Sequence, residues 1–356
     1  AFRKKMVEGM VSKGYEEEFA IRVFRQLEGF GSYGFPESHA ASFAMLVYVS
    51  SYIKCYFPAI FAAALLNSQP MGFYQPAQIV IDAQKHGVIV LPVDINYSYW
   101  DNTLEKAHSG ENNLRLGFRQ VKGLHEEDIQ QIIRHRNESY QRVDQLANIL
   151  STPVLERLAD ADAFRSMGLD RRQALWEIAA LQDRPIALFR NHVSNSVMEG
   201  QISLPLMTPS EHVVQDYAHI GLSVKAHPVS FLRDKLDASH VVPNHKLIRV
   251  KNGMPVKVCG LVTVRQRPGT AKGVLFVTIE DETGFANLVV WGKVFEKYRR
   301  EILQSKLLLA EGHIQVERTV IHVVVKKCYN LNSWLVQLED GQLYGDDVFH
   351  KGRNFQ

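Results

Sequence analysis

A glycine turn between two helical patterns is the first stretch of this sequence that could bind a charged ligand. Residues 121–124, Val-Lys-Gly-Leu, precede a helix whose isoleucines recur on one face. Such a turn can expose backbone N–H groups at a helix N-terminus, where they bind a DNA phosphate. Lys122, Gly123 and Leu124 are therefore candidate contacts to the backbone of duplex DNA, in a helix-hairpin-helix. Alone, the turn would be read as an ordinary glycine cap, but the basic region downstream favours the DNA interpretation.

A second hairpin is expected nearby, and residues 155–168, LERLADADAFRSMG, occupy its place. The pattern places no glycine between its two helices, which argues against phosphate binding there. Asp160 and Asp162 form a D-x-D pair, and paired carboxylates hold the ions of two-metal sites. Because the pair falls in a helical turn with no preceding strand, we assign it no metal.

After Pro243 the sequence changes to strand patterns. Five of them follow one another, with a helical stretch, KVFEKYRREIL, between the third and the fourth. This order is typical of the OB-fold, a small five-stranded barrel that binds oligonucleotides. Aromatic side chains on such a barrel stack on unpaired bases, and cations beside them contact phosphates. The candidate contacts to single-stranded DNA are Arg265, Arg267, Lys272, Phe276, Trp291, Lys326 and Lys327.

The charge of the chain is concentrated in this same region. Residues 245–330 contain 15 Lys and Arg against 7 Asp and Glu, a net charge of +8, whereas the whole chain has a net charge of +3. A local excess of this size makes nucleic acid the first partner to consider. The alternative leaves both aromatic residues in the core and the charges merely solvated, and for Trp291 the two interpretations are equally supported.

A short extended segment suggests a protein partner. QISLPL has a glutamine followed by apolar residues at alternate positions, a pattern that suits a peptide docked in a pocket. It resembles the hexapeptide by which bacterial proteins bind the sliding clamp, although a connector packed on its own protein explains it as well. The possible clamp-binding residues are Gln201, Ile202, Ser203, Leu204, Pro205 and Leu206.

No self-contained active site is visible. The 14 histidines include no HExxH, and no P-loop, GxGxxG or Ser-His-Asp order occurs. The three cysteines are scattered, which argues against a disulfide scaffold or structural zinc. The apolar stretch Ala40–Val49, interrupted only by Ser42, is about half of what a bilayer requires. The chain opens inside a helical pattern without an initiator Met, so we expect a fragment of a longer protein.

Helices must carry the first half of the chain. We predict helices over residues 1–30 and over 38–67 with a break near Pro58. A turn and another helix, ending at Gly87, follow within residues 69–87, and then a short strand. Residues 31–80, GSYGFPESHAASFAMLVYVSSYIKCYFPAIFAAALLNSQPMGFYQPAQIV, resemble the fingers region of bacterial C-family DNA polymerases, relatives of the DNA polymerase III alpha subunit. In that family a Gly-Phe-x-x-Ser-His-Ala segment begins a fingers helix near the incoming nucleotide. The matching residues are Gly34, Phe35, Ser38, His39 and Ala40.

The resemblance extends along the chain and implies a multidomain α + β protein. Its parts would be fingers at 1–111, tandem helix-hairpin-helix at 112–182, a connector at 183–244, the OB-fold at 245–330 and a tail at 331–356. LLNSQPMGFY, PVDINYSYWDNTLE and GLSVKAHPVSFLR resemble the error-prone, damage-tolerant branch. The resemblance implies that Ser38 and His39, with Lys54, contact the dNTP or the primer-template.

The family's palm, with its metal-binding aspartates, would lie upstream of Ala1. The resemblance therefore implies Mg²⁺ in the palm of the parent chain, no cofactor in this fragment and no polymerisation by the fragment alone. Expected partners are DNA, dNTP and either the sliding clamp or a mutagenesis accessory protein, in the bacterial cytoplasm at the nucleoid, with no membrane. The alternatives are a non-catalytic DNA-binding scaffold and a protein-interaction platform.

Overall fold

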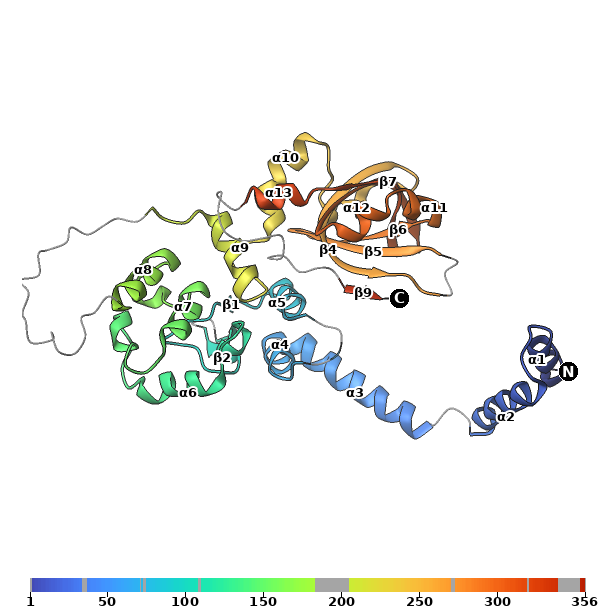
Figure 1. Ribbon diagram of the computed structural model, residues 1–356, viewed down its shortest axis with the longest axis horizontal. Coiled ribbons are helices and arrows are strands. Elements are labelled where there is room, and N and C mark those ends of the chain that lie inside the picture. Colours follow the sequence, from blue (N-terminus) through green and yellow to red (C-terminus); the bar gives the residue numbers. More distant parts are fainter. Residues whose placement is uncertain are drawn as a thin grey trace, which may run out of the picture. The chain divides into compact units, whose positions relative to one another are not determined.

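The computed structural model describes residues 2–33, 37–70, 72, 75–107, 110–182, 205–269, 273–318, 320–338 and 353–355. The chain divides into two compact units, Ala1–Phe61 and Ala62–Gln356. Figure 1 labels most of the helices and strands of both.

The first unit is helical. It contains α1 (Phe2–Val11), α2 (Glu17–Tyr33) and α3 (Glu37–Tyr56), and α4 (Pro58–Asn67) begins at its end. The break between α3 and α4 confirms the predicted restart at Pro58, whose fixed φ suits a first helical turn. Helix α3 leaves a broad apolar surface exposed, formed by Phe43, Met45, Leu46, Val47, Tyr48, Val49, Tyr52 and Tyr56. Exposed apolar area of this extent marks an interaction surface rather than a solvated face.

The second unit opens with α5 (Pro76–Lys85) and a small sheet. Its strand order is β1 (Val90–Leu91), β3 (Asn112–Arg115), β2 (Thr103–Lys106), with β1 parallel and β2 antiparallel to the central β3. We expected a domain boundary between residues 111 and 112. The sheet crosses it, because β1 and β2 precede this position and β3 follows it.

The hairpin region follows the sheet. Its elements are η1 (Phe118–Gln120), α6 (Glu126–His135), η2 (Val143–Gln145), α7 (Thr152–Asp160), η3 (Arg165–Met167) and α8 (Arg171–Gln182). Phe118, Leu146, Leu158 and Phe164 are almost completely buried and form the core that fixes these short helices against one another.

The connector packs on the barrel. It contains α9 (Pro209–His219), η5 (Pro228–Leu232), α10 (Arg233–Ala238) and η6 (Asn244–Arg249). Helix α9 begins with a capping box, in which the Thr208 hydroxyl accepts the Glu211 N–H and the Glu211 carboxylate accepts the Thr208 N–H. Apolar residues of α9, η5 and α10 share a core with the outward-facing Cys259, Leu307 and Leu309 of the barrel.

The barrel confirms the predicted OB-fold. Its strands are β4 (Pro255–Gln266), β5 (Leu275–Asp281), β6 (Gly284–Val290), β7 (Leu307–Glu317) and β8 (Val320–Asn330), and β4–β5 pairing closes the order β5-β6-β8-β7-β4 into a ring. Helices α11 (Gly292–Lys297) and α12 (Arg299–Gln304) fall between the third and fourth strands, α13 (Asn332–Val336) follows the fifth, and β9 (Arg353–Phe355) pairs in parallel with β4 (Figure 1).

Candidate nucleic-acid interface

The first predicted phosphate site, the turn at residues 121–124, lies against the C-terminal end of α9. The backbone N–H of Lys122 donates to the carbonyl of His219 at 2.9 Å. Its Nζ donates to the carbonyls of Ala218 at 2.6 Å and Tyr217 at 3.3 Å. A cation in this position stabilises a helix C-terminus, and partial burial lowers the pKa of the Lys122 ammonium. A DNA phosphate would therefore compete with α9 for this lysine.

The other two residues of the turn have different roles. Gly123 has φ +77°, and a Cβ there would lie 3.1 Å from Nε of Arg157, whose Nη1 donates to the Gly123 carbonyl at 2.7 Å. The turn therefore requires glycine. Leu124 is buried, so its side chain belongs to the core and takes no part in the expected DNA contact. Only its backbone could contact DNA.

The helix that follows the turn is acidic at its start. Glu126, Glu127 and Asp128 occupy the first turn of α6. Carboxylates here stabilise the helix dipole, and they repel a phosphate that approaches the same N–H groups. The three residues are plain in the sequence, and they weaken the phosphate site that the glycine turn alone suggested.

The second hairpin has a glycine after all. Gly168 lies between α7 and α8 with φ +79°, which corrects our expectation of a glycine-free turn. Helix α8 begins only at Arg171, and Asp170 caps it: its Oδ1 accepts the Gln173 N–H at 2.9 Å, and the Gln173 side chain accepts the Asp170 N–H at 3.0 Å. The Asp-x-x-Gln spacing after Gly168 is the capping-box signal that could have placed this helix start.

Protein cations occupy Asp162 of the D-x-D pair. Asp162 Oδ1 accepts a hydrogen bond from Arg165 Nε at 2.8 Å, and Asp162 Oδ2 lies 2.9 Å from the Nζ of Lys225. Burial alone would raise the pKa of Asp162, but Lys225 and Arg171 outweigh it and hold that pKa below its ordinary value. Within the described ranges, no group of three or more His, Cys, Asp or Glu residues could hold a metal ion. The residues present therefore do not fit the two-metal chemistry of a palm.

A buried ion network joins the second hairpin to the connector. Arg171 at the start of α8 pairs with Asp216 of α9, and both side chains are nearly inaccessible. Lys225 also reaches Asp216, at 3.0 Å. The neighbouring Arg172 pairs with Glu211 at 2.7 Å. Both arginines at this helix start thus fasten α8 to α9, and sequence reasoning missed them because their partners lie about 40 residues away.

Arg265, a predicted contact to single-stranded DNA, is inside the barrel. It is only 4% exposed, and its guanidinium donates to the carbonyls of Ile302, at 2.8 Å from Nε, and of Ser305. Burial lowers the pKa of Arg265 to about 10. The side chain therefore caps the C-terminal end of α12 and cannot contact DNA, which corrects the prediction.

A strand irregularity explains the error. The pairing of β4 with β5 shifts register between Val262 and Val264, so one extra residue enters β4. After such a bulge the alternation of inward and outward side chains is displaced by one position. Arg265 consequently pairs with Val277 and faces inward, where regular alternation would have left it outside.

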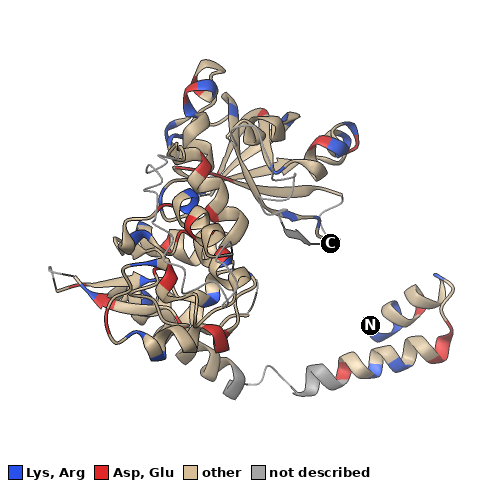
Figure 2. Ribbon diagram, turned by 60° about the vertical axis from the view of Figure 1, so that its left-hand side comes forward, with Lys and Arg blue, Asp and Glu red and all other residues tan. Residues whose placement is uncertain are grey.

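Three other predicted DNA-contacting cations of the barrel, Arg267, Lys326 and Lys327, are exposed; Figure 2 shows where Lys and Arg lie along the ribbon. The guanidinium carbon of Arg267 lies 5.0 Å from the ring centroid of Phe295, a cation–π geometry that leaves the side chain exposed. Lys327 lies 3.8 Å from Glu311, and exposed Lys326 precedes it. These three side chains can still reach a phosphate.

Both predicted stacking residues are accessible. Phe276 is 37% exposed on the outer face of β5, where it pairs with Gln266 of β4 and Val289 of β6. Trp291 is 55% exposed directly before α11. Neither is a core residue, so each has a ring surface available to a base.

Several predicted site residues lie outside what the structure describes: Gly34, Phe35, Lys272, Gln201, Ile202, Ser203 and Leu204. Of the six residues of QISLPL, only Pro205 and Leu206 are described, and both are exposed. In the first unit, Ser38 and His39 belong to the first turn of α3, but their side chains are not described; Lys54 lies in its last turn and is half-buried.

Comparison with known proteins agrees with this architecture. A family model described as a helix-hairpin-helix motif matches residues 87–174, and one described as an OB-fold nucleic acid binding domain matches residues 256–331. Error-prone DNA polymerase 1 of Rhizobium meliloti (strain 1021) is 51% identical over 94% of this chain and 32% of its own length. Over almost its whole length, this chain is similar to the error-prone DNA polymerases.

Other relatives support the same conclusion. Error-prone DNA polymerase 2 of Agrobacterium fabrum is 50% identical over 99% of this chain and 34% of its own length. The resemblance to the error-prone polymerases is thereby confirmed, and the chain spans about a third of the relatives that it matches. Within the described residues, no helix is long and apolar enough to cross a bilayer.

Proposed function

We propose that this chain holds DNA for an error-prone DNA polymerase in translesion synthesis or repair, while another part of the parent protein transfers the nucleotide. The observation that carries the proposal is identity of about half to error-prone polymerases along almost the whole chain. The carboxylate-held Mg²⁺ ions that nucleotidyl transfer requires would be supplied by the parent chain's palm.

The barrel is the proposed site for the single-stranded template. Exposed Phe276 and Trp291 offer stacking surfaces, and Arg267, Lys326 and Lys327 offer charge. Stacking needs no particular sequence, which suits a template of any composition.

Duplex DNA is proposed to meet the first hairpin through the exposed turn at Lys122 and Gly123. The contribution of this turn to affinity should be small, because α9 engages the Lys122 ammonium and α6 starts with three acids. The hairpins then act mainly as a rigid support that orients the barrel's connector.

Nucleotide and protein contacts are proposed at two further places. Ser38, His39 and Lys54 would contact the incoming dNTP or the primer-template, as the family resemblance implies. The QISLPL segment would bind the sliding clamp or a mutagenesis accessory protein; exposed Pro205 and Leu206 leave its end accessible.

The test is the salt dependence of DNA binding. A fluorescent primed template with a single-stranded 5′ overhang is titrated with the chain, and anisotropy gives log K at several salt concentrations. The slope should be steep, and Lys326→Met/Lys327→Met should flatten it by about 0.7 for each lost phosphate contact. Lys106→Met, on β2 outside the barrel, is the matched control and should leave the slope unchanged. Negligible binding at low salt would refute the proposal.

A non-catalytic scaffold is the second candidate, because the two matched family models are a helix-hairpin-helix and an OB-fold, without a catalytic domain. If the chain is part of a polymerase, dNTP should tighten its binding to a primer-template, and His39→Ala should abolish this effect. A scaffold would bind DNA equally well with and without dNTP.

A further inference from the structure

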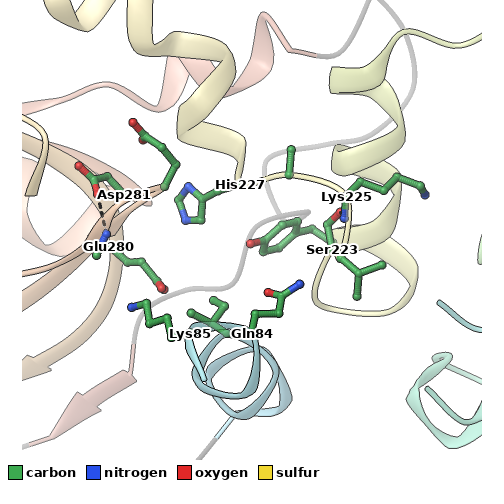
Figure 3. A pocket seen from close by; sticks show the side chains of 13 residues that line it. Gln84, Lys85, Ser223, Lys225, His227, Glu280 and Asp281 are labelled. Atoms are coloured by element: carbon green, nitrogen blue, oxygen red, sulfur yellow. Dashed lines mark hydrogen bonds between the residues drawn. The ribbon is translucent and has the colours of Figure 1, made fainter. Parts of the chain in front are cut away.

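A cavity of about 320 Å³ lies in the second unit, where α5, the end of α9 and the β5–β6 turn meet. Its volume is in the range of small-ligand sites. Figure 3 shows that Lys85 and Gln84 enter from α5, His227 from the segment before η5, and Glu280 from β5.

Several charged groups at this cavity are already paired. Asp281 accepts hydrogen bonds from Arg233 and from the Asn244 N–H, and Glu282 also binds Arg233. Lys225 is held by the ion network described above. These paired groups are held by the protein, so Glu280, His227 and Lys85 are the groups left to contact a ligand.

Glu280 is the acceptor of the cavity. It is 7% exposed, and in the part of the chain that the structure describes its carboxylate makes no hydrogen bond and no ion pair within 4.0 Å. Burial raises the pKa of Glu280 to about 7, although Lys85 opposes that shift. Its carboxyl group lines the cavity without a hydrogen-bond donor from the described protein, so the site suits a group that supplies N–H hydrogens.

His227 is a donor. Its Nδ1 accepts the backbone N–H of Val229 at 3.2 Å, and burial lowers the pKa of His227 to about 4. The neutral ring must therefore carry its proton on Nε2. That nitrogen is buried and has no hydrogen-bond partner.

Lys85 is the second donor. Its Nζ lies 4.5 Å from the ring centroid of Phe285, at the rim of the cavity, and among the described residues it makes no ion pair within 4.0 Å. The cavity therefore combines one carboxylate acceptor with two separate N–H donors, from Lys85 and His227.

We propose that this cavity binds a single unstacked guanine base. Among the four DNA bases, only guanine places two adjacent donors, N1–H and N2–H₂, where one carboxylate can accept both. Its other edge carries the acceptors O6 and N7, which suit Lys85 and His227. Thymine, cytosine and adenine each leave Glu280 with a single donor. A phosphate is excluded from the same position, because it would meet the carboxylate.

This inference rests on the proposed function, since single-stranded template bound on the barrel would bring bases to the turn between β5 and β6, where the cavity lies. The test compares oligonucleotides of thymidine that contain one central guanine, inosine or adenine. Inosine lacks only the N2 amino group. We expect guanine to bind about tenfold more tightly than inosine or adenine, the discrimination typical of one bidentate pair.

Variants assign the preference to the cavity. Glu280→Gln keeps the side-chain volume but removes the carboxylate, so the guanine preference should disappear while affinity for thymidine alone stays unchanged. Glu317→Gln is the matched control, an exposed glutamate on β7 of the same barrel, and should keep the preference. Preference retained by Glu280→Gln, or absent from the unmodified chain, would overturn the proposal.

The pH dependence gives a second readout. The groups that face Glu280 are Lys85 of α5, Tyr217 of α9, His227 and, on its own strand, Asp281. The low pKa of His227 keeps that ring neutral above pH 6. The guanine preference should therefore grow between pH 6 and pH 8 as Glu280 ionises, and Glu280→Gln should show no such change.

Free dGMP separates failure of this site from failure of DNA binding. If the chain bound no DNA, the proposed function would be refuted, and the cavity would be judged by thermal unfolding with millimolar dGMP, dIMP and dAMP. A rise in Tm with dGMP alone, lost in Glu280→Gln, would support the guanine site. No rise with dGMP would refute it.

Discussion

Removing the charge of Asp216 should destabilise the junction between the second hairpin and the connector. In Asp216→Asn the side-chain volume is kept, but Arg171 loses its carboxylate partner. The two side chains are only 2% and 4% exposed, so water cannot replace the lost interaction. Breaking a buried pair in this way costs about 3–5 kcal/mol.

The structure places the expected loss at the lower end of that range. Arg171 would keep hydrogen bonds to the carbonyls of Asp160 at 2.8 Å and His212 at 3.0 Å. Lys225 would keep Asp162 at 2.9 Å. We therefore expect a loss of about 3 kcal/mol in the free energy of opening this junction.

Urea unfolding followed by circular dichroism would measure the global change, and native-state amide hydrogen exchange in α8 and α9 would localise it. Asp101→Asn is the matched control. Asp101 lies 2.7 Å from Arg119, but its side chain is 57% exposed, so its loss should cost less than about 1 kcal/mol. Equal effects of the two substitutions would refute the reasoning that burial makes the Arg171–Asp216 pair strong.

Three further outcomes follow from the geometry. Gly123→Ala should lower the free energy of unfolding by about 1–2 kcal/mol, and Gly168→Ala by about 1 kcal/mol. Both glycines have positive φ, but only a Cβ at Gly123 would also crowd Arg157. Equal urea midpoints for the two variants would contradict this reasoning. Arg265→Met should lower Tm, because two buried carbonyls lose their donor, yet leave the salt slope of DNA binding unchanged. Glu280 binds its proton more tightly in the folded chain, so the free energy of unfolding falls as pH rises from 4.5 toward about 7. The neutral Glu280→Gln variant avoids this loss. Its free energy of unfolding, measured in urea at each pH, should therefore rise relative to the unmodified chain by up to about 3 kcal/mol between pH 5 and pH 8.

The barrel was predictable because its signal is local. Alternating apolar residues mark strands, and a helix between the third and fourth of five strands is enough to select the OB-fold. Phe276 lies between the buried residues Leu275 and Val277 of β5, so the same alternation leaves it exposed. Arg265 was misplaced because a single extra residue in β4 reverses the faces, and a bulge has no clear signature in one sequence.

The hairpins show a different limit. Gly123 was recognised as a turn residue, and its positive φ agrees with that interpretation. The function of Lys122 could not be derived in the same way, because the carbonyls that engage its ammonium belong to α9, about 95 residues later. The Asp170 cap, by contrast, was within reach of local reasoning and was overlooked.

By itself, the sequence determined the order of the parts, the five-stranded barrel, the concentration of positive charge in residues 245–330 and the resemblance to the error-prone polymerases. These depend on local periodicity and composition. Only the tertiary structure decided which cations remain available to DNA, because burial and pairing depend on partners distant in the chain: Arg265 and Arg171 are enclosed, whereas Arg267 and Lys326 are exposed. It also created the cavity around Glu280, since no local pattern brings α5, the connector and β5 together.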